Sequence, residues 1–224
     1  MRTKDPMPRR ETGPLMIVTH RPVIWLDPQK VTLHALPPVA ALAKWSSRFN
    51  PLDRITTAPL YALWRKRLVF GGDWDLAVRD FRGLKPWRLT ADLVAHRDDY
   101  RASEWYRRAV VSLEQNGYFR HKTTHARSLC QIDHMFETEF LPLLDSMRRD
   151  GYQVGRGEWP LGLIDRQGRV LKSEKGRHRF AAALATGARR FPLQIAAIHR
   201  DWARADRGRA LADRVAQLGL GCDP

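Results

Sequence analysis

Residues 172–187, "KSEKGRHRFAAALATG", join a basic turn to a run of small, helix-forming residues. Gly176 permits a sharp turn, and the pattern predicts a helix that begins near Arg177 and ends at Gly187. The first N–H groups of such a helix lack partners within it, and the helix dipole is positive there. Cations therefore oppose the dipole at this end unless an anion is bound. The cations crowded here are Lys172, Lys175, Arg177 and Arg179.

The segments on either side of this stretch predict a sheet. In "WPLGLIDRQGRVLKS" (159–173), two short apolar runs flank Asp165–Gly168, which is typical of a β-hairpin, and Asp165 is expected to have a structural role in the turn. After the helix, "RFPLQIAAIHR" (190–200) predicts a buried strand. Short strands interleaved with helices indicate an α/β (mixed α+β) fold, with a small mixed sheet surrounded by helices.

The rest of the chain predicts a basic, loosely held arm over 1–15, a single domain with helical insertions over 16–204, and a tail helix over 205–224. Within the domain, residues 16–38 predict one or two short strands. Helices are expected over 39–49, over 58–68, over 90–117 with a break near Asp98–Asp99, and over 125–151 with an interruption at Pro142.

The composition of the chain favours some classes of binding partner over others. The 224 residues carry a formal net charge of +15, which favours anionic partners such as nucleotides or nucleic acid. The chain has 2 cysteines, too few for a disulfide framework, and we expect a reducing, cytoplasmic location. No apolar run approaches the ~18 residues that a membrane span needs. The sequence gives no indication of the oligomeric state.

The order of these segments resembles the ParB/sulfiredoxin superfamily. The similarity consists of the hairpin, "GRHR" (176–179), the alanine-rich helix, Gly187 and the strand that opens "RFPLQI", so that the signature covers 159–198. Upstream, "LLDSMRRDGYQ" (143–153) is similar to the helix and glycine that precede the first signature strand. The wider run from "VFGGDWD" to "IHRDW" is similar to a group of uncharacterised ParB-like proteins. The other branch of the superfamily that the chain resembles is the one that contains a free-serine kinase.

This resemblance implies a nucleotide at the glycine turn, because members bind ATP, ADP or CTP there, and it leaves Mg²⁺ as a cofactor to be tested. By match, it assigns phosphate binding to Gly176, Arg177, His178 and Arg179. The charge of the turn adds Lys172, Ser173 and Lys175 to the predicted nucleotide-binding set. His178 is expected to donate to a phosphate oxygen, and Arg179 to stabilise the charge that develops during transfer. Glu174 is the nearest carboxylate in sequence, and we assign it an acid/base or magnesium-linked role.

The function expected from these features is phosphoryl transfer from ATP or a related nucleotide to a hydroxyl acceptor. The alternative is a non-catalytic or CTP-gated DNA- or RNA-binding module that uses the same basic turn. The chain differs from its kinase-like relatives at Lys175, where they often carry an acid, and from ParB proteins at Trp159, where they carry glutamine. Sulfinic acid reduction is excluded because Arg177 stands where sulfiredoxin has its cysteine. A nuclease would need a cluster of metal-binding carboxylates, which the sequence does not show.

Two further groups carry polar chemistry. Asp73 and Asp75, in "GGDWD", are candidate accessory acids or magnesium ligands. The sequence "HKTTHARSLCQIDH" places potential zinc ligands within 14 residues: His121, His125, Cys130 and His134. On one helix, however, the second pair would be rotated by about 140° from the first. Ordinary surface histidines are therefore the favoured interpretation, and we predict no metal site. The scattered tryptophans, Trp105 among them, are expected to be core residues.

Overall fold

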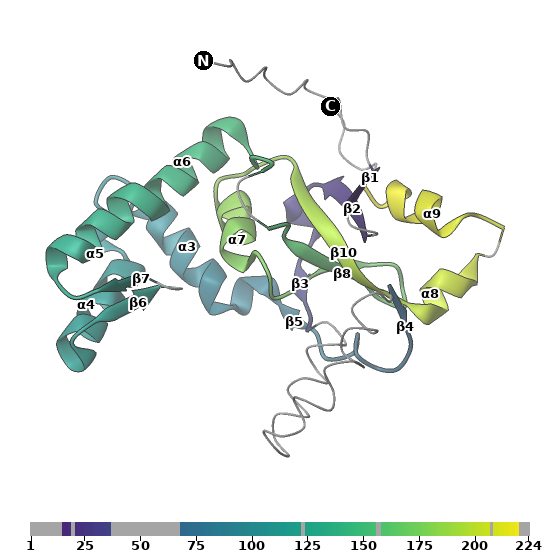
Figure 1. Cartoon of the computed structure of the whole chain (residues 1–224), viewed down its shortest axis with the longest axis horizontal. Helices are drawn as coiled ribbons and strands as arrows, with labels where there is room; N and C mark the ends of the chain where they lie inside the picture. The colour runs from purple at the N-terminus through teal and green to yellow at the C-terminus, as the bar shows by residue number, and fades with distance from the viewer. Residues whose placement is uncertain are drawn as a thin grey trace, which may run out of the picture.

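A computed structural model describes residues 15–18, 21–36, 68–121, 124–155, 158–206 and 208–219. The fold is mixed α/β, as the sequence predicts: one mixed sheet with helices packed at both of its ends (Figure 1). The helices expected over 39–49 and 58–68, and the arm before Leu15, lie outside the described residues.

The sheet combines antiparallel and parallel pairs around strand β10. Its strands in spatial order are β1 (Leu15–Val18), β2 (Arg21–Leu26), β10 (Phe191–His199), β8 (Leu161–Ile164), β9 (Val170–Lys172), β3 (Leu33–His34) and β5 (Arg79–Asp80). A further strand, β4 (Val69–Phe70), pairs with the far end of β10. Nearly all of β10 is buried, which explains its continuous apolar run.

The predicted hairpin and helix are both confirmed. Strands β8 and β9 pair antiparallel around a turn in which the Asp165 carboxylate accepts hydrogen bonds from the backbone N–H groups of Gln167 and Arg169. Helix α7 (Arg177–Ala185) follows, and Gly187 ends it with a φ of +71°. Phe180 and the next four residues are all buried, because the sheet covers one side of α7 and neighbouring helices cover the other.

Those neighbouring helices form a lobe beside α7 (Figure 1). The elements of the lobe are α3 (Lys85–Ala95), α4 (Glu104–Asn116), α5 (Leu129–Met135), a π-helical turn η4 (Phe136–Phe140) and α6 (Leu141–Asp150). The break near Asp98–Asp99 is confirmed, since a short 3-10 turn, η3 (Tyr100–Ala102), separates α3 from α4. Gly117, with a left-handed backbone, ends α4 as predicted.

Two expectations about helices are wrong. The segment around His121 and His125 is a hairpin of β6 (Phe119–His121) and β7 (Thr124–Ala126), because cross-strand pairing overrides the helical spacing of the two histidines. The tail helix expected over 205–224 begins only at Leu211, as α9 (Leu211–Gln217), and the separate helix α8 (Arg200–Ala205) precedes it, because the backbone is extended at Asp206. Two other short 3-10 turns are η1 (Pro28–Lys30) and η2 (Phe81–Gly83).

Candidate functional site

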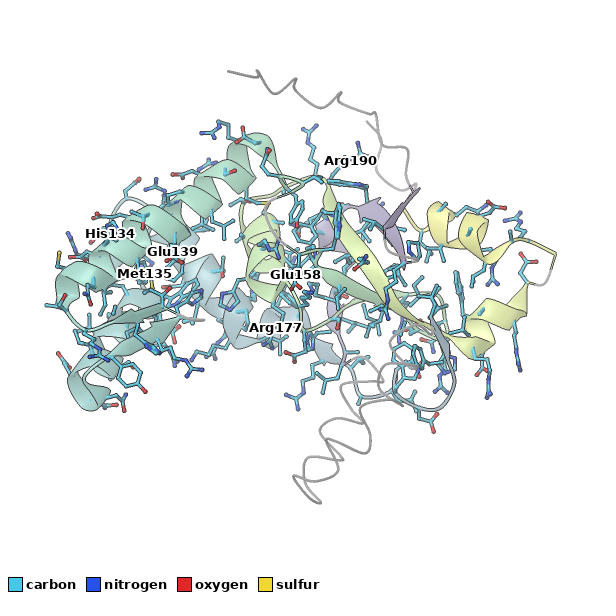
Figure 2. All side chains as sticks on the ribbon, viewed as in Figure 1. His134, Met135, Glu139, Glu158, Arg177 and Arg190 are labelled. Atoms are coloured by element: carbon cyan, nitrogen blue, oxygen red, sulfur yellow. The ribbon has the colours of Figure 1, made fainter. Side chains whose placement is uncertain are left out.

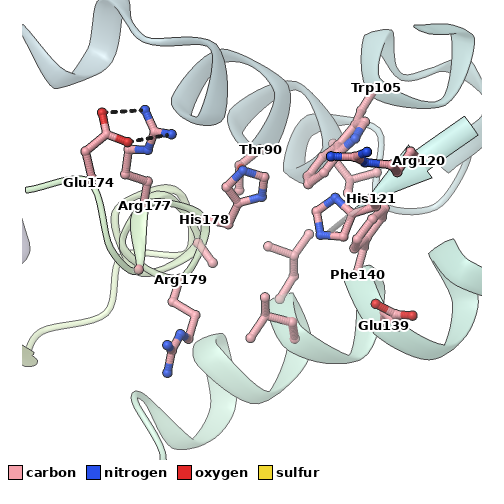
Figure 3. A pocket seen from close by; sticks show the side chains of 15 residues that line it. Thr90, Trp105, Arg120, His121, Glu139, Phe140, Glu174, Arg177, His178 and Arg179 are labelled. Atoms are coloured by element: carbon pink, nitrogen blue, oxygen red, sulfur yellow. Dashed lines mark hydrogen bonds and ion pairs between the residues drawn. The ribbon is translucent and has the colours of Figure 1, made fainter. Parts of the chain in front are cut away.

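A cavity of about 690 Å³ lies between the N-terminus of α7 and the helical lobe (Figure 3). Its walls come from α3, α4, β6, η4, α6, α7 and the turn before α7. The side chains with chemistry on its lining are Thr90, Arg120, His121, Glu139, Glu174, Arg177, His178 and Arg179. Segments far apart in the sequence therefore converge on the basic turn that the sequence singled out.

The turn before α7 takes its shape from Gly176. This residue has a φ of +79° and is the N-cap of α7. A Cβ atom added to it would lie 2.7 Å from Cβ of Pro160 and 2.9 Å from Cα of the same residue. Both the positive φ and the close approach of Pro160 require glycine. The tight turn sets the first residues of α7 along the cavity wall.

The arginines of the turn differ in how their charge is compensated. Arg177 Nη2 lies 3.0 Å from Glu174 Oε2, so this pair is close to neutral. Arg179 donates to the Tyr152 hydroxyl at 2.8 Å and to the Glu158 backbone carbonyl at 2.6 Å. Because both of these acceptors are neutral, the charge of Arg179 is retained at the cavity. Burial is the main reason that the pKa of Tyr152 lies above its ordinary value.

Two histidines from distant elements face each other across the cavity. The ring centroids of His178, on α7, and His121, on β6, are 5.4 Å apart (Figure 3). The Trp105 ring lies 5.5 Å from that of His178 and 5.9 Å from that of His121. Imidazoles at this separation can serve as proton donor or acceptor to one bound molecule.

The structure brings only part of the predicted set together. Glu174, Gly176, Arg177, His178 and Arg179 line the cavity, whereas Lys172, Ser173 and Lys175 do not. Lys172 is fully buried, and its Nζ donates to the backbone carbonyls of Leu161, Ser173 and Lys175 at 3.0, 2.7 and 2.6 Å.

These three acceptors use all the donors of a lysine side chain, so the placement of Lys172 corrects its assignment to phosphate binding. Burial, with smaller contributions from Arg177 and Arg179, lowers the pKa of Lys172 well below its ordinary value. Ser173 is also fully buried. The amine of Lys175 lies 2.6 Å from a carboxylate oxygen of Glu158.

Three lining residues were missed from the sequence. Arg120 forms no ion pair with any residue that the structure describes, and it lines the cavity from β6. Thr90 is buried, and its Oγ1 has no hydrogen-bond partner among the described residues. Glu139 contributes a carboxylate from η4. The basic run "FRHK" gave a signal for Arg120, but nothing local distinguishes Thr90 or Glu139.

A buried histidine supports the turn from the sheet side. His34 Nε2 lies 4.0 Å from Glu174 Oε1, and His34 pairs with Lys172 across β3 and β9. Burial lowers the pKa of His34 to about 4, with the nearby Glu174 carboxylate opposing that change. The imidazole is therefore neutral at pH 7.

Asp73 and Asp75 lie outside the cavity, in a cluster at the β8–β9 turn. Asp75 is buried and accepts from the Arg166 side chain at 2.7 Å and from its backbone N–H at 3.0 Å. Burial raises the pKa of Asp75, but the hydrogen bonds from Arg166 outweigh this effect and hold the pKa below its ordinary value. Asp73 is exposed and pairs with the same guanidinium. The structure thus gives both acids a structural role, which corrects their assignment as accessory acids.

His199 completes this cluster. Its Nδ1 accepts from the Asp201 backbone N–H at 3.1 Å, so its Nε2 carries the proton and donates to the Gly72 carbonyl at 2.8 Å. The Asp75 and Asp165 carboxylates and the His199 imidazole are thereby hydrogen-bonded within the protein. No acid of this cluster is directed to a ligand.

The four potential zinc ligands do not converge. His121 and His125 lie on the β6–β7 hairpin, whereas Cys130 and His134 lie on α5. Figure 2 shows His134 and Glu139 on the lobe and Arg177 nearer the middle of the molecule. Across the described parts of the chain, no group of three His, Cys, Asp or Glu side chains is placed to hold a metal ion.

The chain matches no family model, no curated protein and no solved structure. Within the described residues, no helix has the length and apolar character needed to cross a membrane. The cavity offers cations for an anion, imidazoles for proton transfer and two carboxylates.

Proposed function

We propose that the cavity binds the phosphates of a nucleoside triphosphate and that the protein transfers a phosphoryl group to a hydroxyl acceptor. The observation that carries this proposal is the convergence of Arg120, Arg177 and Arg179 on one cavity at the N-terminus of α7. Arginine forks match phosphate oxygens, and the helix terminus adds backbone donors. The volume of about 690 Å³ suits a nucleotide.

The charge balance of the lining supports an anionic ligand. Glu174 compensates Arg177, while Arg120 and Arg179 form no ion pair within the described part of the chain. The unpartnered Thr90 hydroxyl adds a buried donor on the same lining. The several phosphates of one nucleotide would place negative charge along this lining, and the resemblance to the ParB/sulfiredoxin superfamily implies the same class of ligand.

Each lining residue has a role in this proposal. Arg120 and Arg179 bind the phosphates, and Arg179 stabilises the charge on the transferred group. His178 takes the proton of the attacking hydroxyl, and Glu174 holds Arg177 in position. Mg²⁺ usually takes one or two carboxylates together with phosphate oxygens, and Glu139, which forms no ion pair within the described residues, would supply one when the ion is bound.

Thermal unfolding with ATP, CTP and ADP, each with Mg²⁺, tests nucleotide binding. We expect a nucleotide at 100 times its Kd to stabilise the protein by about 2.7 kcal/mol. Arg179→Ala and Arg120→Ala should each remove most of this effect. The matched control is Lys175→Ala, which also removes one cation from the turn but lies outside the cavity, and it should retain the stabilisation.

Two results would contradict the proposed function. If no nucleotide stabilises the wild-type protein, while DNA or RNA binds with an affinity that falls steeply with salt, the basic turn belongs to a nucleic-acid module. The net charge of +15 is the observation that favours this second candidate. If nucleotide binds but neither hydrolysis nor transfer products form, the protein is a nucleotide-gated binder and the transfer step is disproved.

A further inference from the structure

A second cavity, of about 960 Å³, shares a wall with the first. The shared residues are Trp105, Arg120, His121, Arg177 and His178. The second cavity extends from this wall along α3 and α4, whereas the first extends toward η4 and α6. The two facing histidines therefore stand between two spaces, each large enough for a small molecule.

The lining of the second cavity is cationic beyond the shared wall. It adds Lys85, Arg107 and Arg108 and a single acid, Glu104. Glu104 is engaged with Arg108, at 2.6 Å. Lys85 and Arg107 form no ion pair within the described residues, so this cavity has its own uncompensated positive charge.

Neutral polar side chains complete this lining. Gln115 presents an amide from the last turn of α4, and next to it the Asn116 amide nitrogen donates to the Ser112 hydroxyl, which itself donates to the Tyr118 carbonyl. Amides and hydroxyls of this kind hydrogen-bond to hydroxyl groups on a ligand. The combination of two cations with neutral polar groups fits a molecule that carries both an anionic group and hydroxyls.

We propose that the second cavity binds the phosphoryl acceptor, and that the acceptor is a small molecule with a phosphate or carboxylate group beside its reactive hydroxyl. This inference rests on the proposed function, which places the nucleotide in the first cavity. Lys85 and Arg107 bind the anionic group, and the hydroxyl lies at the shared wall beside His121 and His178. The volume of about 960 Å³ suits a small molecule, whereas a nucleic-acid strand would need a groove that tracks its backbone.

The reaction that follows is balanced. The acceptor oxygen forms a bond to the γ-phosphorus of the nucleoside triphosphate, and the bond from that phosphorus to the bridging oxygen of the β-phosphate breaks. The hydroxyl proton passes to an imidazole of the shared wall and then to solvent. The products are a nucleoside diphosphate and a phosphorylated acceptor. The positive charge on both sides of the wall reduces the repulsion between the two anionic substrates.

The test uses glycerol 3-phosphate and inorganic phosphate as probes, with glycerol as the uncharged control. Each is titrated by NMR into the full chain saturated with a non-hydrolysable ATP analogue and Mg²⁺. We expect both phosphates to bind and glycerol not to bind. Lys85→Ala and Arg107→Ala should each weaken phosphate binding at least fivefold and leave the affinity for the analogue unchanged.

Arg88→Ala is the matched control, because Arg88 is exposed on the same helix as Lys85 but does not line the cavity. Equal weakening by all three variants would mean diffuse electrostatic attraction and would overturn the inference, as would the absence of phosphate binding. Binding of a single-stranded 12-mer oligonucleotide that depends on Lys85 and Arg107, without binding of either free phosphate, would assign the cavity to nucleic acid instead. If the analogue itself does not bind, the proposed function fails, and the phosphate titration without it reports separately on the second cavity.

Discussion

The β8–β9 hairpin carries a cluster of charged side chains at each end, and the two clusters differ in how completely their charges are compensated. At the turn, Asp75 and Arg166 satisfy each other, and His199 is hydrogen-bonded on both ring nitrogens. At the other end, beyond β9, Arg179 bonds only neutral oxygens, and Arg120 has no ion-pair partner among the described residues. Charged residues thus serve the fold at the first end and remain available to a ligand at the second.

A high density of charged residues therefore does not by itself identify a ligand-binding site. Both stretches, "GGDWD" and "SEKGRHR", place charged residues beside glycine, and both supplied candidate functional residues. What separates them is whether each buried charge finds its partner inside the protein. Four measurements test whether the two ends of the hairpin differ in this way.

The largest effect is expected at the turn. Arg166→Met leaves the Asp75 carboxylate, 1% exposed, without its partner, and we expect a loss of about 3–5 kcal/mol in the free energy of unfolding. Urea denaturation measures this loss. The matched control is Asp73→Asn, which breaks a pair with the same guanidinium at a side chain that is 78% exposed, and should cost less than about 1 kcal/mol. Equal losses in the two variants would contradict a closed, structural cluster.

Gly176→Ala should have the next largest effect. A left-handed backbone costs a non-glycine residue about 1–2 kcal/mol, and the added Cβ would also press on Pro160. We expect the free energy of unfolding to fall by about 2–4 kcal/mol in all, and nucleotide binding to be lost. Gly187→Ala provides the control, since its φ is +71° but nothing lies within 4 Å of the added Cβ. If Gly187→Ala destabilises the protein as much as Gly176→Ala, the close approach to Pro160 is not important.

The dependence of stability on pH should separate the two ends. His34 has its pKa lowered from 6.5 to about 4, so the unfolded chain binds the proton more tightly. The neutral His34 contributes fully to the free energy of unfolding above pH 6.5. This contribution is lost as the pH falls toward 4, and about 2 kcal/mol of it is already lost at pH 5. Asp75 has a lowered pKa, so it stabilises the folded protein at every pH above the ordinary pKa of a carboxyl group. Its contribution to the free energy of unfolding is lost only below about pH 4.

Urea denaturation of His34→Leu at pH 7 and pH 5 checks this assignment. The variant should lose about 2 kcal/mol less than the wild-type protein over that interval. Asp73→Asn should show the wild-type difference between pH 7 and pH 5, because Arg166 still holds the pKa of Asp75 below its ordinary value. A variant of His34 with an unchanged pH dependence would rule out a buried, neutral imidazole beneath the turn.

The smallest effect on stability is expected from Arg120→Ala. Because this arginine has no ion-pair partner among the described residues, its loss should change the free energy of unfolding by no more than about 0.5 kcal/mol. The same variant should nevertheless lose most of its stabilisation by nucleotide. Thermal unfolding with and without ATP measures both quantities. A destabilised Arg120→Ala protein would place Arg120 in the fold and weaken the contrast between the two ends.

The sequence predicted the elements whose signals are local. Asp165 and Gly168 mark the hairpin turn, and Gly176 and Gly187 mark the ends of α7, because each of these conformations depends on a few adjacent residues. The sequence-based prediction failed where pairing between two segments decides the secondary structure. The histidines at 121 and 125 fit a helical spacing equally well, and only the register of β6 with β7 makes them strand residues.

The candidate site was predicted in part for the same reason. Charge can be read from the sequence but the direction of a side chain cannot, so Lys172 was counted with the arginines although it is directed into the interior. Arg120, Thr90 and Glu139 come from separate elements and meet Arg179 only in the folded chain. Their convergence depends on how α7 packs against the lobe, which no local pattern encodes.

The burial of Lys172 makes it a natural reporter of how often the sheet opens. An amine-reactive reagent can modify this side chain only after its Nζ leaves the carbonyls at the end of β9. Lys175, three residues along, has a side chain that is 40% exposed and reacts from the folded state. Mass spectrometry of a single peptide that contains both lysines would therefore give their labelling ratio. That ratio reports the opening of the strand beside the candidate site, with an internal standard already in the chain.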